Sequence, residues 1–175
     1  MKRIFAVVFV LIVLAAFTPL GCFAEDEPIP LTCENLTTSN GLLAEGSYTL
    51  VDNNCPDINN ITLNGGVTLD LNGNKLNAQG DIRCGSSSCP LTIIDNSAGN
   101  TGTLTVKTIH IYNGALWISG GTVEATGDEY GIYAGGGITI SGTVTATGTN
   151  GTGIYAGGDI AISGTVEKEI GRAHV

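Results

Sequence analysis

A repeat near the C-terminal end constrains the fold of this chain more than any other feature. The sequence GIYAGGGITISGTVTATG begins at Gly131, and a close copy, GIYAGGDIAISGTVE, begins at Gly153. A weaker copy, ISGGTVEATG, begins at Ile118, where one additional glycine shifts the phase. The copies recur with a period of roughly 22 residues, and self-similarity at a fixed period of this length is typical of solenoids, in which each repeat forms one coil stacked on the next.

Short segments from Ile61 onward have the sequence pattern of β-strands. In VTLDL, LTVKT, IHIY and ITIS, apolar residues alternate with polar ones, which predicts half-buried strands. No segment has a helical apolar stripe, so we expect almost no helix. Similar strands could build a sandwich, but sandwich strands have different neighbours and no reason to be copies. The sequence therefore predicts an all-β solenoid over residues 61–168, with coils of roughly 22 residues each.

One repeat can be divided into three short faces with glycine or asparagine corners: GIYAGGG, ITISG and TVTATGTNGT. We expect Ile138 and Ile140 to point inward on one face and Val144 on the next. Parallel stacking at about 4.8 Å then places Ile140 over Ile162 and Val144 over Val166.

The N-terminus predicts export. Lys2 and Arg3 precede an apolar run from Ile4 to Phe17, and residues 1–24 fit a signal peptide cleaved after Ala24. The run is shorter than the roughly 20 residues of a spanning helix, which argues against a membrane anchor. A lipoprotein signal with Cys22 as the lipidated residue is the alternative. Either signal implies a secreted or cell-surface protein.

Residues 25–60 are predicted to form an irregular N-terminal cap with one short strand near Tyr48. A first coil without a cap would expose its core and an open edge, so terminal segments of solenoids are atypical.

The cysteines predict disulfides. If Cys22 leaves with the signal, four remain, and an even number in an exported chain favours pairing. Cys84 and Cys89 flank a short Gly-Ser-Ser-Ser loop, which leaves Cys33 to pair with Cys55. Four cysteines allow three connectivities, of which this is the simplest. A zinc site is the alternative, but the chain lacks a close C-x-x-C pair with a nearby histidine.

Three segments carry a family resemblance. VTLDLNGNKL (67–76), LTIIDNSAGNTGTLTV (91–106) and the GIYAGGGITISGTVTATG unit resemble coils of exported microbial β-helix proteins of the broad pectin-lyase-like group. The resemblance covers roughly residues 61–168 and implies a single-stranded right-handed parallel β-helix. The group includes polysaccharide lyases and hydrolases, carbohydrate-binding proteins and adhesins, so the resemblance specifies the fold better than the activity.

The last residues, 169–175, interrupt the repeat. EIGRAHV resembles the translated start of a common sequencing-library adapter, so we interpret it as read-through and exclude it from the fold. A genuine polar terminus is the alternative. On this interpretation the chain is an N-terminal fragment of a longer protein.

Charge and candidate catalytic groups limit the function. The net charge of −9 repels phosphate backbones, so we expect no nucleic-acid partner. We expect His110 to be an exposed strand residue and Arg83 to serve the loop beside Cys84. None of the candidate carboxylates belongs to a paired motif with a nearby histidine, and the sequence therefore predicts no catalysis. These carboxylates are Asp70, Asp81, Asp95, Asp128, Glu129 and Asp159.

Two oxygen-rich segments could hold Ca²⁺, namely Asp52-Asn53-Asn54 with Asp57, and Asp128-Glu129. Neither matches a defined calcium-loop motif, and such residues are common in turns. We therefore predict no cofactor, with Ca²⁺ as the weaker alternative.

Aromatic residues are the candidate ligand contacts. Tyr133 and Tyr155 occupy the same repeat position, and they point outward if Ile132 and Ala134 point inward. Exposed aromatic rings pack against the apolar faces of sugars, and Trp117 could join them. The alternative is that the tyrosines only stabilise the stack.

The sequence thus favours a non-catalytic extracellular or cell-surface scaffold for adhesion or polysaccharide binding. Its expected partner is an extracellular polysaccharide or a host or cell surface. The alternative is a fragment of a polysaccharide lyase or glycoside hydrolase whose catalytic coils lie downstream.

Overall fold

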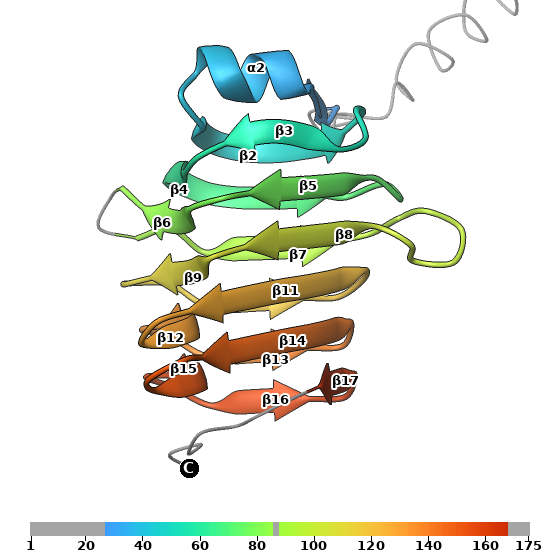
Figure 1. Ribbon diagram of the computed structural model, residues 1–175. Helices are drawn as coiled ribbons and strands as arrows, with labels where there is room; N and C mark the ends of the chain where they lie inside the picture. The colour runs from blue at the N-terminus through green and yellow to red at the C-terminus, as the bar shows by residue number, and fades with distance from the viewer. Residues whose placement is uncertain (1–26, 86–87, 168–175) are drawn as a thin grey trace, which may run out of the picture.

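Short strands with alternating apolar and polar residues form a parallel β-solenoid (Figure 1). The computed structural model describes residues 27–85 and 88–167. The predicted signal peptide, with its Cys22, and the 169–175 segment lie outside the described residues. Within the described part of the chain, no helix has the length and apolar character needed to cross a membrane.

From β6 onward, each coil contributes one strand to each of three faces, as predicted. Face 1 consists of β6 (Asp81–Cys84), β9 (Thr108–Ile111), β12 (Tyr130–Ala134) and β15 (Thr152–Ala156). Face 2 consists of β7 (Leu91–Ile94), β10 (Leu116–Ile118), β13 (Ile138–Ile140) and β16 (Ile160–Ile162). Face 3 consists of β3 (Cys55–Ile58), β5 (Lys75–Ala78), β8 (Thr103–Val106), β11 (Thr122–Gly127), β14 (Thr143–Gly148) and β17 (Thr165–Glu167).

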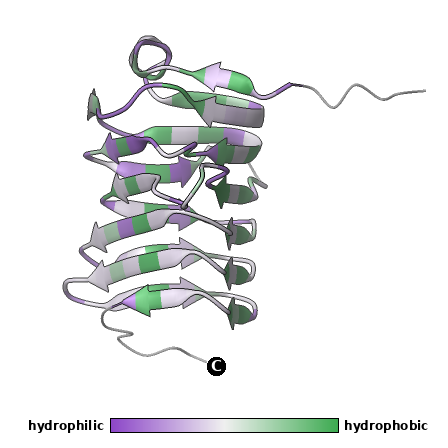
Figure 2. Ribbon diagram, turned by 90° about the vertical axis from the view of Figure 1, so that its right-hand side faces the viewer, coloured by the Kyte–Doolittle hydropathy of each residue, from purple (hydrophilic) through white to green (hydrophobic). Residues whose placement is uncertain are grey.

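The predicted stacking register is confirmed. Ile140 pairs with Ile162 and Val144 pairs with Val166, each in parallel strands of adjacent coils. Ile138, Ile140 and Val144 are buried. Hydrophobic bands recur at matching places along successive coils in Figure 2, as expected for a continuous aliphatic interior. The phase predicted for ITIS and TVTAT is therefore correct.

The additional glycine of the weaker repeat lies at a corner between faces 2 and 3. Ile118 pairs with Ile140 and Thr122 pairs with Thr143, so the sequence separation within the second pair is shorter by one position. The difference is accommodated at Gly120-Gly121. Gly121 has φ of +68°, a left-handed conformation that glycine adopts without a Cβ clash.

The solenoid begins earlier than the sequence predicted. The strand β2 (Leu42–Leu50) pairs in parallel with β4 (Ile61–Asp70), and both run through faces 1 and 2. Their register shifts between Ala44 and Gly46, and such a bulge breaks the alternation. Because of this bulge, the sequence of β2 lacks a continuous alternation, and it was predicted as irregular chain with one short strand.

The cap is smaller than predicted and contains a helix. β1 (Ile29–Leu31) pairs with β2, and α2 (Cys33–Thr38) lies over the first coil (Figure 1). The Thr32 hydroxyl accepts the Asn35 N–H at 3.0 Å, which caps the helix N-terminus. Leu36 is fully buried beneath the helix, so α2 covers the apolar interior that the first coil would otherwise expose.

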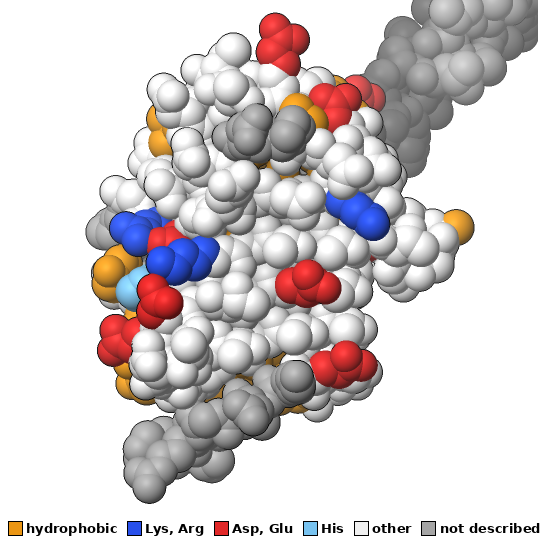
Figure 3. Space-filling view, in the orientation of Figure 1, with side chains coloured by type: hydrophobic (Ala, Val, Ile, Leu, Met, Phe, Trp, Pro, Cys, Tyr) orange, Lys and Arg blue, Asp and Glu red, His pale blue; other side chains and the backbone are white. Residues whose placement is uncertain are grey.

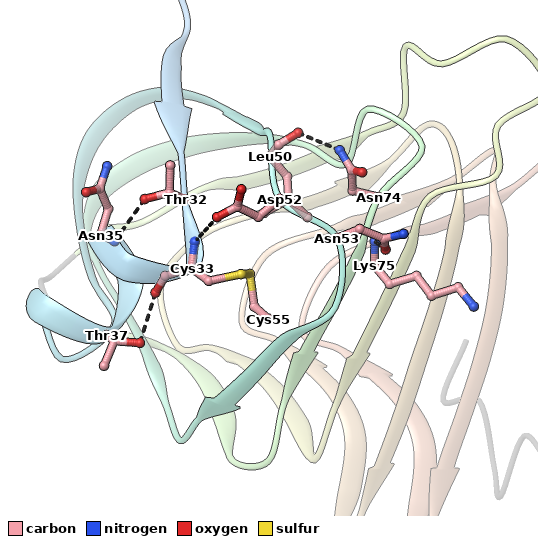
Figure 4. The surroundings of a disulfide bond; sticks show 10 residues. All are labelled: Thr32, Cys33, Asn35, Thr37, Leu50, Asp52, Asn53, Cys55, Asn74 and Lys75. Atoms are coloured by element: carbon pink, nitrogen blue, oxygen red, sulfur yellow. Dashed lines mark hydrogen bonds between the residues drawn. A yellow bond between two sulfur atoms is a disulfide. The ribbon is translucent and has the colours of Figure 1, made fainter.

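Both predicted disulfides are present. Cys33 and Cys55 are bridged with a Cα–Cα distance of 5.0 Å, and Cys84 and Cys89 with 5.6 Å. Figure 4 shows that the Cys33–Cys55 bridge joins the start of α2 to β3. The backbone N–H of Cys33 also donates to Asp52 at 2.8 Å. The sulfurs considered for a zinc site are thus bonded in pairs.

Candidate functional site

The tyrosines of the repeat lie on the outside of face 1. Ile132 and Ala134 are fully buried, and Tyr133 between them is half-buried on the outer surface. Tyr133 pairs in register with Tyr155, which is also half-buried. The predicted orientation of these two side chains is therefore confirmed.

Three more rings join the tyrosines in what we call the aromatic cluster, comprising His110, Tyr112, Tyr130, Tyr133 and Tyr155. The rings of Tyr133 and Tyr155 are stacked, with centroids 5.1 Å apart and planes 5° apart. Tyr130 lies 5.4 Å from Tyr133 and 5.6 Å from Tyr155. His110 lies 4.5 Å from Tyr133 and stacks on Tyr112 at 4.1 Å. The cluster thus spans three successive coils.

The rings of the cluster differ in what they present to solvent. Tyr133 and Tyr155 stack face to face, so each covers one ring face of the other. Tyr112 follows β9 and is 55% exposed, so it presents the largest open aromatic surface of the cluster. A ligand on face 1 would therefore meet the Tyr112 ring beside the edges of the stacked pair.

His110, Tyr112 and Tyr130 were not identified from the sequence as members of this cluster. His110 and Tyr133 are 23 residues apart, one more than Ile118 and Ile140, because the segment between β9 and β10 is one residue longer than the segment between β12 and β13. The longer spacing places His110 directly beside Tyr133, as the strand register shows. Tyr112 and Tyr130 have no tyrosine at the equivalent position of the next coil, so the repeat could not identify them.

Trp117 does not join the cluster. It lies on β10 in face 2, where its register partners in the adjacent coils are Thr92 and Thr139. Its side chain is 41% exposed. The structure thus places the three predicted carbohydrate contacts on two different faces.

A charged depression adjoins the aromatic cluster on face 1, and Figure 3 shows basic, acidic and histidine side chains gathered at one margin of the molecule. Arg83 forms an ion pair with Asp81 and so does not simply serve the neighbouring loop, as the sequence had suggested. Lys107 Nζ lies 3.1 Å from Asp128 Oδ2. The depression is lined by Asp81, Arg83, Lys107, Thr108, His110, Asp128, Glu129 and Tyr130.

The surroundings shift two ionisation equilibria in this region. Burial and the positive charge of Arg83 lower the pKa of His110 below its ordinary value of 6.5. Burial, the negative charge of Glu129 and a hydrogen bond with Glu129 raise the pKa of Tyr130 above its ordinary value of 10.0. At neutral pH the imidazole is therefore mostly uncharged, and the phenol keeps its proton and can donate a hydrogen bond.

Two of the candidate catalytic carboxylates serve the corner between faces 2 and 3. Asp95 accepts the backbone N–H groups of Gly73, Ser97 and Gly102. Burial acts to raise the pKa of Asp95, but these hydrogen bonds outweigh it and hold the pKa below its ordinary value of 3.8. Asp70 is also buried and accepts from Asn72 and Asn96. Both carboxylates thus satisfy hydrogen-bond donors of this corner.

The oxygen-rich segments considered for Ca²⁺ have structural partners. Asn53 Oδ1 accepts the Lys75 N–H at 3.0 Å (Figure 4), and Asn54 adopts a positive φ of 59°. The side chain of Asp57 lies outside the described part of the structure. Across residues 27–85 and 88–167, no three His, Cys, Asp or Glu side chains are arranged to hold a metal ion.

Comparison of the chain with protein-family models, with curated proteins and with solved structures finds no match. The chemistry of face 1 is therefore the basis for a functional assignment.

Proposed function

We propose that this chain is a non-catalytic, extracellular or cell-surface β-solenoid scaffold that binds a polysaccharide through face 1. The aromatic cluster is the observation that carries the proposal. Its five rings span the coils of β9, β12 and β15 on one outer face. A row of rings that crosses several coils suits an extended polymer better than a small compact ligand.

The cluster offers both kinds of contact that sugars use. The apolar face of a sugar ring packs against an aromatic ring, while its hydroxyls need hydrogen-bond partners. Tyr112 offers an exposed ring, and the adjoining charged depression offers donors and acceptors.

Extracellular placement is supported by the two disulfides. Disulfides persist in oxidising compartments and are rare in the cytosol. A non-catalytic role is supported by the hydrogen bonds and ion pairs that already engage Asp70, Asp81, Asp95 and Asp128.

A pull-down assay on insoluble glycans tests this proposal. We expect the Tyr112→Ala variant and the double variant Tyr133→Ala/Tyr155→Ala to bind more weakly than the wild type. Trp117→Ala removes an exposed ring of comparable size from face 2 and serves as the matched control, with binding retained. Circular dichroism checks that each variant keeps its β structure.

Two results would contradict the proposal. One is full binding by both folded tyrosine variants, which would leave the cluster as a structural ladder. The other is loss of binding in Trp117→Ala alone, which would move the site to face 2.

A further inference from the structure

The charged depression on face 1 has an excess of negative charge. Asp81 and Asp128 are each paired with a cation, whereas Glu129 is a third, exposed carboxylate whose negative charge acts on Tyr130. His110 does not neutralise the negative charge of Glu129, because its lowered pKa leaves the imidazole mostly uncharged at neutral pH. The depression is therefore lined by three carboxylates and only two cationic side chains.

Asp81 adds an acceptor that is not in use. The residue is 8% exposed, and its Oδ2 atom accepts from the Arg83 guanidinium. Its Oδ1 atom is buried and has no hydrogen-bond partner within residues 27–85 and 88–167. A buried acceptor without a donor is costly. Asp81 lines the depression, so a ligand donor that reaches Oδ1 as the side chain turns gains binding free energy.

We propose that face 1 recognises an amine-bearing glycan, that is, a polysaccharide whose amino sugars carry free ammonium groups. This inference rests on the proposed function and specifies its ligand class. An ammonium group has three N–H donors and no acceptor, which suits a site rich in carboxylate oxygens. Ammonium groups are also attracted to the faces of aromatic rings, and His110 and Tyr130 belong to both the depression and the aromatic cluster.

The charge of the whole chain favours the same ligand class. A net charge of −9 attracts a cationic polymer and repels one that carries carboxylates or sulfates. The two basic residues of the depression, Arg83 and Lys107, already face carboxylates of the protein. An acidic sugar would have to compete with Asp81 and Asp128 for them.

Calorimetric titration with two oligosaccharides of equal length tests the inference. One is an oligomer of glucosamine with free amines, and the other is the corresponding N-acetylglucosamine oligomer. We expect the glucosamine oligomer to bind more tightly. Its advantage should shrink as added salt shortens the Debye length from about 10 Å at 0.1 M to about 3 Å at 1 M.

A matched pair of variants locates the effect. Glu129→Gln removes the free carboxylate and should weaken binding of the glucosamine oligomer by up to about fivefold, the size of an exposed ion pair. Glu124→Gln removes the same charge from β11 on face 3, where the Thr105 hydroxyl donates to Glu124 at 3.2 Å. This control should bind like the wild type.

The results separate this inference from the proposed function. Equal affinity for both oligomers, or equal weakening by both variants, would overturn the preference for amines while glycan binding itself stands. Binding of neutral or acidic glycans in place of the glucosamine oligomer would overturn it in the same way. Binding of no glycan at all would overturn both the inference and the proposed function.

Discussion

The corner between faces 2 and 3 is built in two different ways along the stack. In the later coils it is short, and backbone groups of adjacent coils satisfy each other, as in Ser141 N–H to Ile118 O at 2.7 Å and Thr165 N–H to Gly142 O at 3.1 Å. In the earlier coil it is a long loop between β7 and β8, which projects from the stack (Figure 1). There Asp95 accepts three backbone N–H groups.

This difference shows what a regular coil requires. A repeat of constant length brings each backbone donor beside an acceptor of the adjacent coil, so the corner needs no polar side chain. Added residues lose that match, and a buried side chain must supply the missing acceptors. The early corner therefore depends on the Asp95 side chain, whereas the late corners are held mainly by backbone hydrogen bonds between adjacent coils.

Replacement of Asp95 should have the largest effect. Asp95→Ala leaves the N–H groups of Gly73, Ser97 and Gly102 without their acceptor, and we expect a loss of about 4 kcal/mol in the free energy of unfolding. Urea denaturation measures this loss. Asp159→Ala removes an exposed carboxylate before β16 and serves as the control. Equal loss in both variants would contradict the role given to Asp95.

Acid should weaken the same corner. Because the pKa of Asp95 is lower in the folded protein than its ordinary value of 3.8, the ionised carboxylate stabilises the fold above that value. This contribution is lost as the pH falls below 3.8 through the folded pKa. Denaturation at several pH values should show a steeper acid loss in the wild type than in Asp95→Asn, and parallel curves would contradict the assignment.

Substitution of a corner glycine should be the next largest effect. A Cβ at Gly135 would lie 1.8 Å from the backbone oxygen of Tyr112 in the adjacent coil. Backbone atoms cannot move aside independently, so Gly135→Ala should cost about 3 kcal/mol. Gly99→Ala in the long early loop is the comparison, because its nearest neighbour would be a side-chain carbon at 3.7 Å, although its positive φ adds some strain. Thermal melts that rank Gly99→Ala as the more damaging change would contradict the comparison.

The Cys84–Cys89 disulfide should contribute less than either corner. It closes a short loop with a sequence separation of 5, so it restricts the unfolded chain only modestly, and Cys84→Ser/Cys89→Ser should cost about 2 kcal/mol. The measurement is the urea midpoint with and without reductant. A variant as stable as the oxidised wild type would show that the bridge adds nothing to the early coils.

The smallest expected effect concerns His110. Because the charge of Arg83 contributes to its lowered pKa, Arg83→Gln should raise that pKa toward 6.5. An NMR titration of the imidazole resonances measures the change, and His110→Gln assigns the signal. An unchanged or lower pKa would contradict the proximity of Arg83 and His110 that their strand register implies.

The late coils could be predicted from the sequence almost residue by residue. A constant period fixes the register of Ile140 over Ile162, and simple alternation fixes which side of the strand Tyr133 occupies. The early coils could not be predicted to the same degree. The bulge between Ala44 and Gly46 hid the strand β2, because one displaced residue reverses the apparent inside and outside.

The candidate site was predicted only where it repeats. Tyr133 and Tyr155 are copies and were identified, whereas Tyr112 and Tyr130 have no such copies. Arg83 and Asp81 lie on one strand, and their ion pair depends on side-chain conformations that a period does not encode. The charged depression is therefore a property of the three-dimensional arrangement.

The most direct test of a glycan-binding face 1 is backbone NMR of the labelled protein during titration with soluble oligosaccharides, including the glucosamine oligomer. We predict that amide shifts change at His110, Tyr112, Glu129, Tyr133 and Tyr155, while those of Trp117 on face 2 and Glu124 on face 3 stay unchanged. Changes centred on Trp117, or no changes with any oligosaccharide, would contradict it.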